Sequence, residues 1–185
     1  MNFLLLAQMV EDQATIYVED LWTSLWFLIS KFVRNLFDYY HLCPTQLAPN
    51  FIGLIISFAL LYHLFPTNPH PSLFRAFFIL HPHSKAKGWW FFNPRKGLFF
   101  IFNLPSSIHG WKNQFFFISS SSSWGFPSSW DDLRIGPNEH SQVDIINRED
   151  FFQLKNMKIP VQQELMTEQT LYDVGLSSVT SLHIA

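Results

Sequence analysis

The first half of the chain alternates apolar stretches with proline-rich breaks, a pattern that predicts helices. Within residues 21–40 the apolar side chains recur at the i, i+3, i+4, i+7 spacing of a helix with one buried stripe. Glu19 and Asp20 precede this stretch and suit the positive end of a helix. Residues 51–65 are uncharged and nearly all apolar, so we expect a central buried helix over 51–64. A third helix, "LFRAFFIL", is expected to follow, capped by Ser72.

The pattern changes after Gly88 to three short aromatic or β-branched runs, "WWFF", "LFFIFNL" and "QFFFIS". The sequence "NPRKG" between the first two is typical of a tight turn, which predicts a β-hairpin with a third strand after it. Successive positions are apolar in each run, so both faces of this sheet are expected to be covered. We therefore predict an α+β fold: a helical N-terminal half packed on a small three-stranded antiparallel sheet over residues 88–119, with a looser C-terminal tail.

The C-terminal part is more polar. The serine run at 119–123 predicts a low-complexity loop, and "WGFPSSWDD" predicts turns. Two short helices are expected, in "DIINREDFFQLKNM" and in "TEQTLYDVGL", the second stopped by Gly175.

Composition sharpens three points. The 21 Phe residues and the 18% aromatic content predict an aromatic-rich core. Cys43 is the only cysteine, which excludes an internal disulfide or a cysteine-based zinc site within one chain and favours an intracellular protein, in the nucleus or the cytoplasm. The start "MNFLLLAQMVEDQ" lacks a cationic region and a small-residue cleavage site, so we expect no signal peptide. Residues 51–65 would extend roughly 22 Å as a helix, short of the roughly 30 Å of a bilayer core, so a buried helix is favoured over a membrane span.

Charge is divided unevenly along the chain. Residues 1–38 hold two basic and five acidic residues, and residues 131–185 hold four basic and nine acidic ones. Residues 39–130 contain no Asp or Glu. The cations of this acid-free region are Arg75, Lys85, Lys87, Arg95, Lys96 and Lys112.

Several blocks resemble a known family. The sequences "TQLAPN", "PSLFRAFFIL", "HSKAKGWWFFNPRKG", "LPSSIHGWKNQFFFIS" and "WGFPSSW" are similar to the plant gypsy-type transposon, or transposase-like, domain. "YVED" resembles its start and "ELMTEQTLYDVGLSS" its closing segment, so the resemblance covers residues 16–178. It implies a derivation from long-terminal-repeat retrotransposons and a detached or truncated copy of a longer protein. The chain would then comprise an extension (1–15), the α+β domain (16–130), an acidic segment of the same unit (131–178) and a tail (179–185).

Two departures from the family pattern are visible. Family members more often carry Gly-Leu-Arg followed by a proline where this chain has "LWTSLWFLISKFVRNLF", and the serine run is unusually long. Neither departure touches an active residue, because the resemblance brings no established active site.

Catalysis is not expected from these residues. Transposase-type nucleases join DNA with metal ions held by clustered carboxylates, and the acid-free region cannot supply them. Asp131 and Asp132 are adjacent in a turn-rich segment and are interpreted as solvated loop acids or helix caps. His81 and His83 lack the spacing of a metal site, and no serine has a nucleophile-elbow pattern around it. We expect no enzyme activity, no cofactor, no metal and no small-molecule substrate.

Nucleic-acid contact is the function that the middle of the chain allows. Lysine and arginine neutralise phosphates, and aromatic rings stack on unpaired bases. This use requires that Trp89 or Phe91 be exposed, and core packing is the competing interpretation for each ring, because successive residues of a strand face opposite sides. The candidate contact residues are Lys85, Lys87, Trp89, Arg95, Lys96 and Lys112.

The sequence thus predicts a non-enzymatic structural or interaction module that binds RNA or DNA weakly through residues 39–130, if the domain retains a role. One alternative is self-association, with itself or with a coiled-coil-bearing relative, through a flat uncharged patch. A second is membrane association through residues 51–65. A cation-rimmed aromatic surface would favour nucleic acid over assembly.

Overall fold

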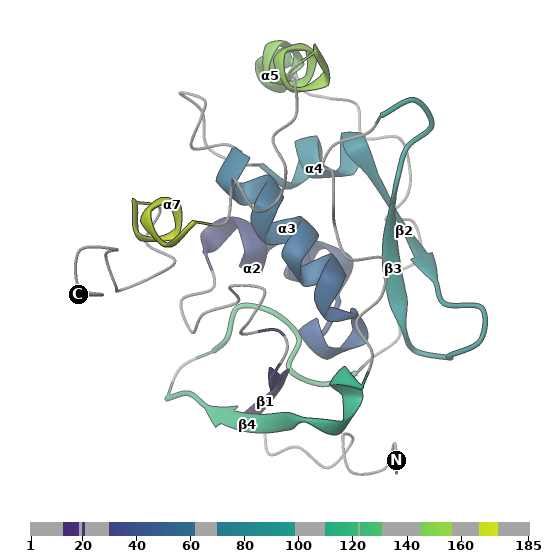
Figure 1. Ribbon diagram of the computed structural model, residues 1–185, viewed down its shortest axis with the longest axis vertical. Helices are drawn as coiled ribbons and strands as arrows, with labels where there is room; N and C mark the ends of the chain where they lie inside the picture. The colour runs from purple at the N-terminus through teal and green to yellow at the C-terminus, as the bar shows by residue number, and fades with distance from the viewer. Residues whose placement is uncertain are drawn as a thin grey trace.

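The structure is a computed structural model that describes residues 13–18, 20, 30–61, 70–98, 110–121, 123–130, 145–156 and 167–173. These residues form five α-helices and two antiparallel sheets of two strands each, which confirms the predicted α+β class (Figure 1). Helix α3 crosses the middle of the molecule, with the β2–β3 hairpin along one side and the β1–β4 pair below it (Figure 1).

Helix α3 (Pro49–Leu61) is the buried central helix that the apolar run predicts. It begins at a proline, whose missing N–H would have no partner in the first turn of a helix. Nearly all of its side chains are buried, because it carries no charged residue and has neighbours on every side. Among the described residues, every helix is too short or too polar to cross a membrane.

Helix α2 (Lys31–Tyr40) confirms a helix in the second half of the stretch 21–40, but it begins at Lys31 after the non-helical Ser30, so the prediction of one continuous helix was wrong at this point. Residues 21–29 lie outside the described residues. Its apolar stripe is buried, and its charged side chains face outward. The Ser30 hydroxyl accepts a hydrogen bond from the Val33 N–H at 3.3 Å and caps the first turn. The helix ends at His41, which adopts the left-handed conformation with φ of 53°.

Helix α4 (Pro71–Phe77) corrects two predictions. Its N-cap is His70, whose ring nitrogen accepts the Ser72 N–H at 3.2 Å, so the prediction of Ser72 as the cap was wrong. The helix also stops before Phe78, and the last residues of "LFRAFFIL" begin strand β2 (Phe78–Pro82). A local helical pattern cannot show that a partner strand is available at this point, and pairing in a sheet overrides it.

The prediction of a three-stranded sheet was wrong as well. Strand β3 (Trp90–Pro94) pairs antiparallel with β2, with Leu80 opposite Phe92. Strand β4 (Phe115–Ser119) pairs antiparallel with β1 (Gln13–Tyr17) in a separate sheet. The runs "WWFF" and "QFFFIS" are therefore strands as predicted, but their partners come from other parts of the chain. Almost all of the run "LFFIFNL" lies outside the described residues.

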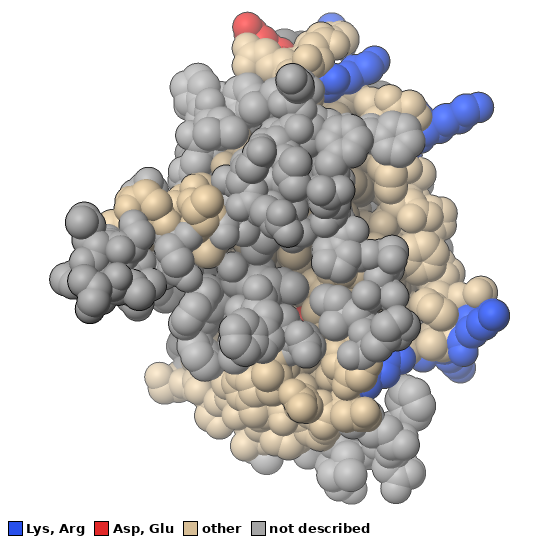
Figure 2. All heavy atoms as spheres, viewed as in Figure 1, with Lys and Arg blue, Asp and Glu red and all other residues tan. Residues whose placement is uncertain are grey.

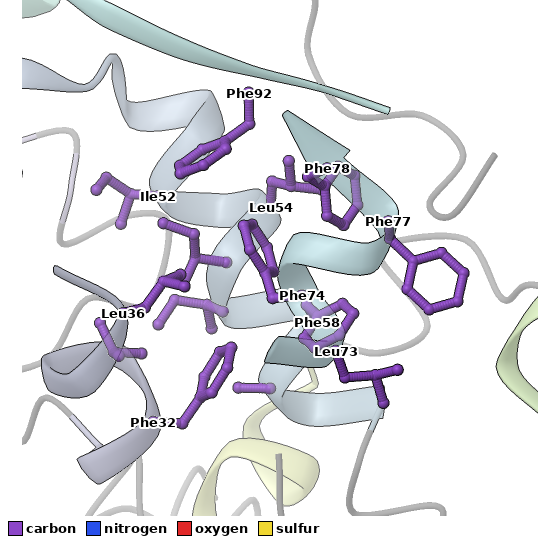
Figure 3. Close-up of a cluster of buried hydrophobic side chains, with 14 of the residues drawn as sticks. Phe32, Leu36, Ile52, Leu54, Phe58, Leu73, Phe74, Phe77, Phe78 and Phe92 are labelled. Carbon is purple, nitrogen blue, oxygen red and sulfur yellow. The ribbon is translucent and has the colours of Figure 1, made fainter. Parts of the chain in front are cut away.

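Rings from several elements fill the centre of the molecule, as the aromatic content predicts. The Phe58 ring lies 5.7 Å from that of Phe32 and 5.1 Å from that of Phe74, and the Phe74 ring lies 5.0 Å from that of Phe92 (Figure 3). We call the following buried set the phenylalanine core: Phe32, Phe58, Phe74, Phe77, Phe78 and Phe92.

A second, smaller cluster lies beside the β1–β4 pair. Trp89 is at its centre, with ring centroids at 4.9 Å from Trp111, 5.1 Å from Trp130 and 6.2 Å from Tyr17. We call these four residues the tryptophan cluster. Trp130 joins it from the turn-rich segment after the serine run, and its indole N–H donates to the Thr45 hydroxyl at 2.8 Å.

Two short helices follow in the C-terminal part, as predicted. Helix α5 (Ile145–Asn156) packs on the core through Phe151, whose ring lies 4.9 Å from that of Phe77. Helix α7 (Glu168–Asp173) is capped by Thr167, whose hydroxyl accepts the Thr170 N–H at 3.1 Å. Gly175, the predicted stop, lies outside the described residues.

Candidate nucleic-acid interface

The predicted cations separate into two groups at opposite ends of the β2–β3 hairpin. Lys85 and Lys87 lie in the loop from His83 to Gly88 that joins the strands. Arg95 and Lys96 lie in the turn after β3. A strand of five residues at ~3.3 Å per residue separates the two groups by roughly 16 Å. Figure 2 shows Lys and Arg atoms of the described residues along the right side of the view and over α5, and most of the red Asp and Glu atoms lie over α5.

Of the two cations after β3, Arg95 makes hydrogen bonds within the fold. The Nε of Arg95 donates to the Arg75 carbonyl oxygen at 3.0 Å. The backbone N–H of Arg95 donates to the Phe77 carbonyl oxygen at 2.7 Å. Arg95 therefore satisfies carbonyl groups at the end of α4 that the helix itself leaves without partners. The Arg75 guanidinium lies 4.1 Å above the Tyr39 ring. Lys96 remains exposed in the turn.

The other group lies beside a cavity. The cavity has a volume of about 380 Å³ and is open to solvent. It is formed by the start of α3, the loop between β2 and β3, strand β3 itself and the single turn η3 (Trp111–Asn113). Its lining residues are Ala48, Asn50, Phe51, His83, Ala86, Trp89, Trp90, Phe91, Trp111 and Lys112. Lys112 thus joins the group of Lys85 and Lys87, which flank Ala86.

The hairpin loop is held in place by its own hydrogen bonds. The His83 N–H donates to the Trp89 carbonyl oxygen at 2.8 Å, and the Trp89 N–H donates to that of Ala86 at 3.2 Å. The Gln46 side chain donates to the Gly88 carbonyl oxygen at 3.2 Å and ties the loop to the short helix η1 (Pro44–Gln46). These bonds present Lys85 and Lys87 to solvent from a fixed backbone.

Trp89 does not meet the condition for base stacking. Its side chain is 5% exposed, and the other rings of the tryptophan cluster surround it. The Lys112 ammonium lies 4.1 Å from its ring centroid. Trp89 therefore supports the wall of the cavity, and a base would have to contact a different ring.

Of the two rings that the sequence offers for stacking, Phe91 is the one that remains available. It is half-buried, and its ring centroid lies 6.1 Å from that of Phe51 and 5.6 Å from that of the stacked His81 ring. The alternation expected for a strand holds here, because its neighbour Phe92 is buried in the phenylalanine core.

The turn η3 places two adjacent residues in different environments, with Trp111 buried and Lys112 exposed. Gly110 precedes it with φ of 80°, a conformation that glycine adopts without strain. Trp111 then enters the tryptophan cluster at 7% exposure, and Lys112 stays on the surface over the rings. No local pattern in the sequence singles out Trp111, Phe51, Asn50 or His83 as cavity residues, because they meet only through tertiary packing.

Among the described residues that line the cavity, Lys112 is the one with a charged side chain, and none is Asp or Glu. The buried thiol of Cys43 is not a reactive nucleophile. Burial raises the pKa of Cys43 to about 11, so its thiol stays neutral at physiological pH. Burial also raises the pKa of Tyr17, with the Asp20 carboxylate adding to the effect.

The histidines near the cavity contact other groups. The Nδ1 of His83 accepts the Lys85 N–H at 3.2 Å, and the His81 ring stacks on Phe91. Within the part of the chain that the structure describes, His, Cys, Asp and Glu side chains nowhere gather in a group of three that could hold a metal ion.

A comparison with protein families gives a match to part of the chain. The family model described as "Putative gypsy type transposon" matches residues 16–82. The match supports a gypsy-type transposon-like domain in this part of the chain, which runs from β1 to the end of β2. No curated protein and no solved structure matches the chain. Three residues of the cavity, Ala48, Asn50 and Phe51, lie within the matched segment, and the others follow it.

Proposed function

We propose that this transposon-related chain is a non-enzymatic interaction module that binds single-stranded RNA or DNA weakly. Its contact surface would be the cavity and the three lysines beside it, Lys85, Lys87 and Lys112. The observation that carries the proposal is this juxtaposition of cations with an aromatic cavity in a region without acids. An intracellular location, in the nucleus or the cytoplasm, belongs to the same proposal.

The number of cations implies weak and salt-dependent binding. Each phosphate that a lysine neutralises contributes about −0.7 to the slope of log K against log salt for a single strand. Three contacts give a slope of about −2, so affinity should fall roughly 20-fold between 50 mM and 200 mM salt. The absence of acids matters as much, because nearby carboxylates would repel the strand.

Self-association is supported less well by the described surface. The large apolar side chains that are exposed there come from four different elements: Tyr39 from α2, Phe117 from β4, Phe152 from α5 and Tyr172 from α7. A specific assembly interface needs such side chains gathered in one patch. The aromatic cavity is rimmed by cations, which favours nucleic acid.

The proposal of a non-enzymatic role rests on the chemistry of the cavity. Apart from the indole N–H groups, the polar side chains among its described lining residues are an amide, an imidazole and an ammonium, and none is a carboxylate or a hydroxyl. General acid–base catalysis uses a base oriented toward a nucleophile, and the cavity lining offers no such pair.

The test is a titration of the chain with labelled single-stranded RNA and DNA at several salt concentrations, with the mass followed by light scattering. Replacing Lys85, Lys87 and Lys112 together by alanine should lower affinity at least tenfold and flatten the salt dependence. A matched control removes three exposed cations elsewhere, through Lys31→Ala, Arg148→Ala and Lys155→Ala, and should change affinity less than threefold.

Two results would contradict the proposal. One is the absence of binding even at low salt, and the other is an equal loss of affinity in the two triple variants. A mass that rises with protein concentration in the absence of nucleic acid would instead favour self-association.

A further inference from the structure

We infer that the cavity is a binding site for one unpaired nucleobase, with the adjoining phosphate on Lys112. This inference rests on the proposed function and deepens it, because it names the part of the strand that the cavity recognises. It does not follow from the lysines alone, which would bind any polyanion.

The size of the cavity suits a single base. About 380 Å³ is near the lower end of the roughly 300–1,000 Å³ that small-molecule sites occupy. The walls come from three separate segments, with Phe51 on α3, Phe91 on β3 and Trp111 on η3. A flat ligand can contact rings from more than one of them.

The walls are also preformed. Trp111 is edge-on to both Trp89 and Tyr17, at 4.9 Å and 4.6 Å between centroids, and it is almost fully buried. The hairpin loop is fixed by the backbone hydrogen bonds described above. A ligand would therefore find rigid rings and would lose little free energy to ordering the site.

The polar groups of the cavity suit the edge of a base. The Nδ1 of His83 accepts the Lys85 N–H, so the neutral imidazole carries its proton on Nε2 and can donate there. The Asn50 amide offers both donors and an acceptor. Unpaired bases are read by such groups on their hydrogen-bonding edges while aromatic side chains stack on their faces.

The charge of Lys112 distinguishes between cationic and anionic ligands of an aromatic site. The Lys112 ammonium lies 4.1 Å from the Trp89 ring centroid and 5.4 Å from that of Trp111, at the position that a cationic ligand of an aromatic cage would take. A cation would be repelled, and no acid among the described lining residues offsets the repulsion. An anion with an aromatic part is favoured, and the exposed Lys85 and Lys87 are the chain neighbours of Ala86, which lines the cavity.

The experiment compares two single strands of equal length and charge, one with bases and one abasic throughout. The strand with bases should bind at least about tenfold more tightly, because stacking of one base on an aromatic side chain changes affinity by roughly that much or more. Phe91→Ala should reduce the ratio at least about threefold, because one of the rings that a base can contact is removed, and should leave binding of the abasic strand unchanged. Phe91→Leu keeps the apolar volume without the ring and should act in the same way if Phe91→Ala does not fold.

The control is Phe152→Ala, which removes a 52% exposed ring from α5 and should keep the full ratio. Equal binding of the two strands would overturn the inference and leave the proposed function standing, whereas failure of both strands to bind would overturn both. Aromatic grooves also bind proline-rich peptides. If such a peptide binds in a way that depends on Phe91 and the two strands do not differ, the cavity is a peptide site and the inference is wrong.

Discussion

The phenylalanine core and the tryptophan cluster use aromatic side chains differently. Rings of the phenylalanine core contact other apolar side chains, and Phe58 is 0% exposed. In the tryptophan cluster, Trp130 donates a hydrogen bond to Thr45, and Lys112 lies over Trp89. Tryptophan combines a large apolar ring with a polar N–H, so it can form a wall between the interior and a polar surface. The difference explains why the cavity lies beside the second cluster.

The largest expected effect concerns the phenylalanine core. Phe58→Ala should lower the free energy of unfolding by about 3–5 kcal/mol, because it leaves a cavity among fully buried rings. Urea denaturation followed by circular dichroism measures the change. Phe117→Ala, at a 46% exposed ring on β4, is the control and should cost less than about 1 kcal/mol. Similar losses in the two variants would show that Phe58 is not at the centre of the core.

A smaller effect is expected where the hairpin loop meets the tryptophan cluster. Gly88 has φ of 86°, and a Cβ there would lie 3.0 Å from the Trp130 ring. Gly88→Ala should cost about 2–3 kcal/mol, since the left-handed conformation alone costs an alanine roughly 1–2 kcal/mol.

Gly97→Ala separates the two causes. Gly97 has φ of 78° with nothing within 4 Å of its would-be Cβ, so only the conformational cost applies. Equal losses in thermal or urea unfolding for the two glycine variants would show that Trp130 does not press on the loop.

The smallest effect tests the hydrogen bond of the tryptophan cluster. Thr45→Val removes the hydroxyl that accepts the Trp130 indole N–H and that also hydrogen-bonds the Cys43 thiol, so it should cost about 1–2 kcal/mol. Thr45→Ser keeps the hydroxyl and should recover most of the loss. Urea denaturation gives the stabilities, and the tryptophan emission of the folded state should shift in Thr45→Val alone. An unchanged stability in Thr45→Val would mean that the bond contributes nothing to holding Trp130.

Prediction from the sequence succeeded where structure depends on neighbours along the chain. The buried stripe of α2, the uniformly apolar α3 and the strand character of "WWFF" and "QFFFIS" all follow from periodicity and side-chain shape. It failed at "FIL" after Phe77, where the helical pattern continues but the chain pairs with β3. The pattern of a strand says which faces are apolar and does not say which other strand it meets.

The candidate site divides in the same way. The acid-free middle of the chain and its lysines could be identified from the sequence, because charge is a property of composition. The sequence could not show whether Trp89 faces solvent or which cations lie together. Trp89 is buried by Trp111 and Trp130, 22 and 41 positions further along the chain. Tertiary packing also brought Phe51 to Phe91 and placed Lys112 over the rings. The sequence by itself determined an aromatic α+β domain with an acid-free middle. Only the tertiary structure decided that its rings and Lys112 line one cavity, since contacts between distant residues are set by packing rather than by local pattern.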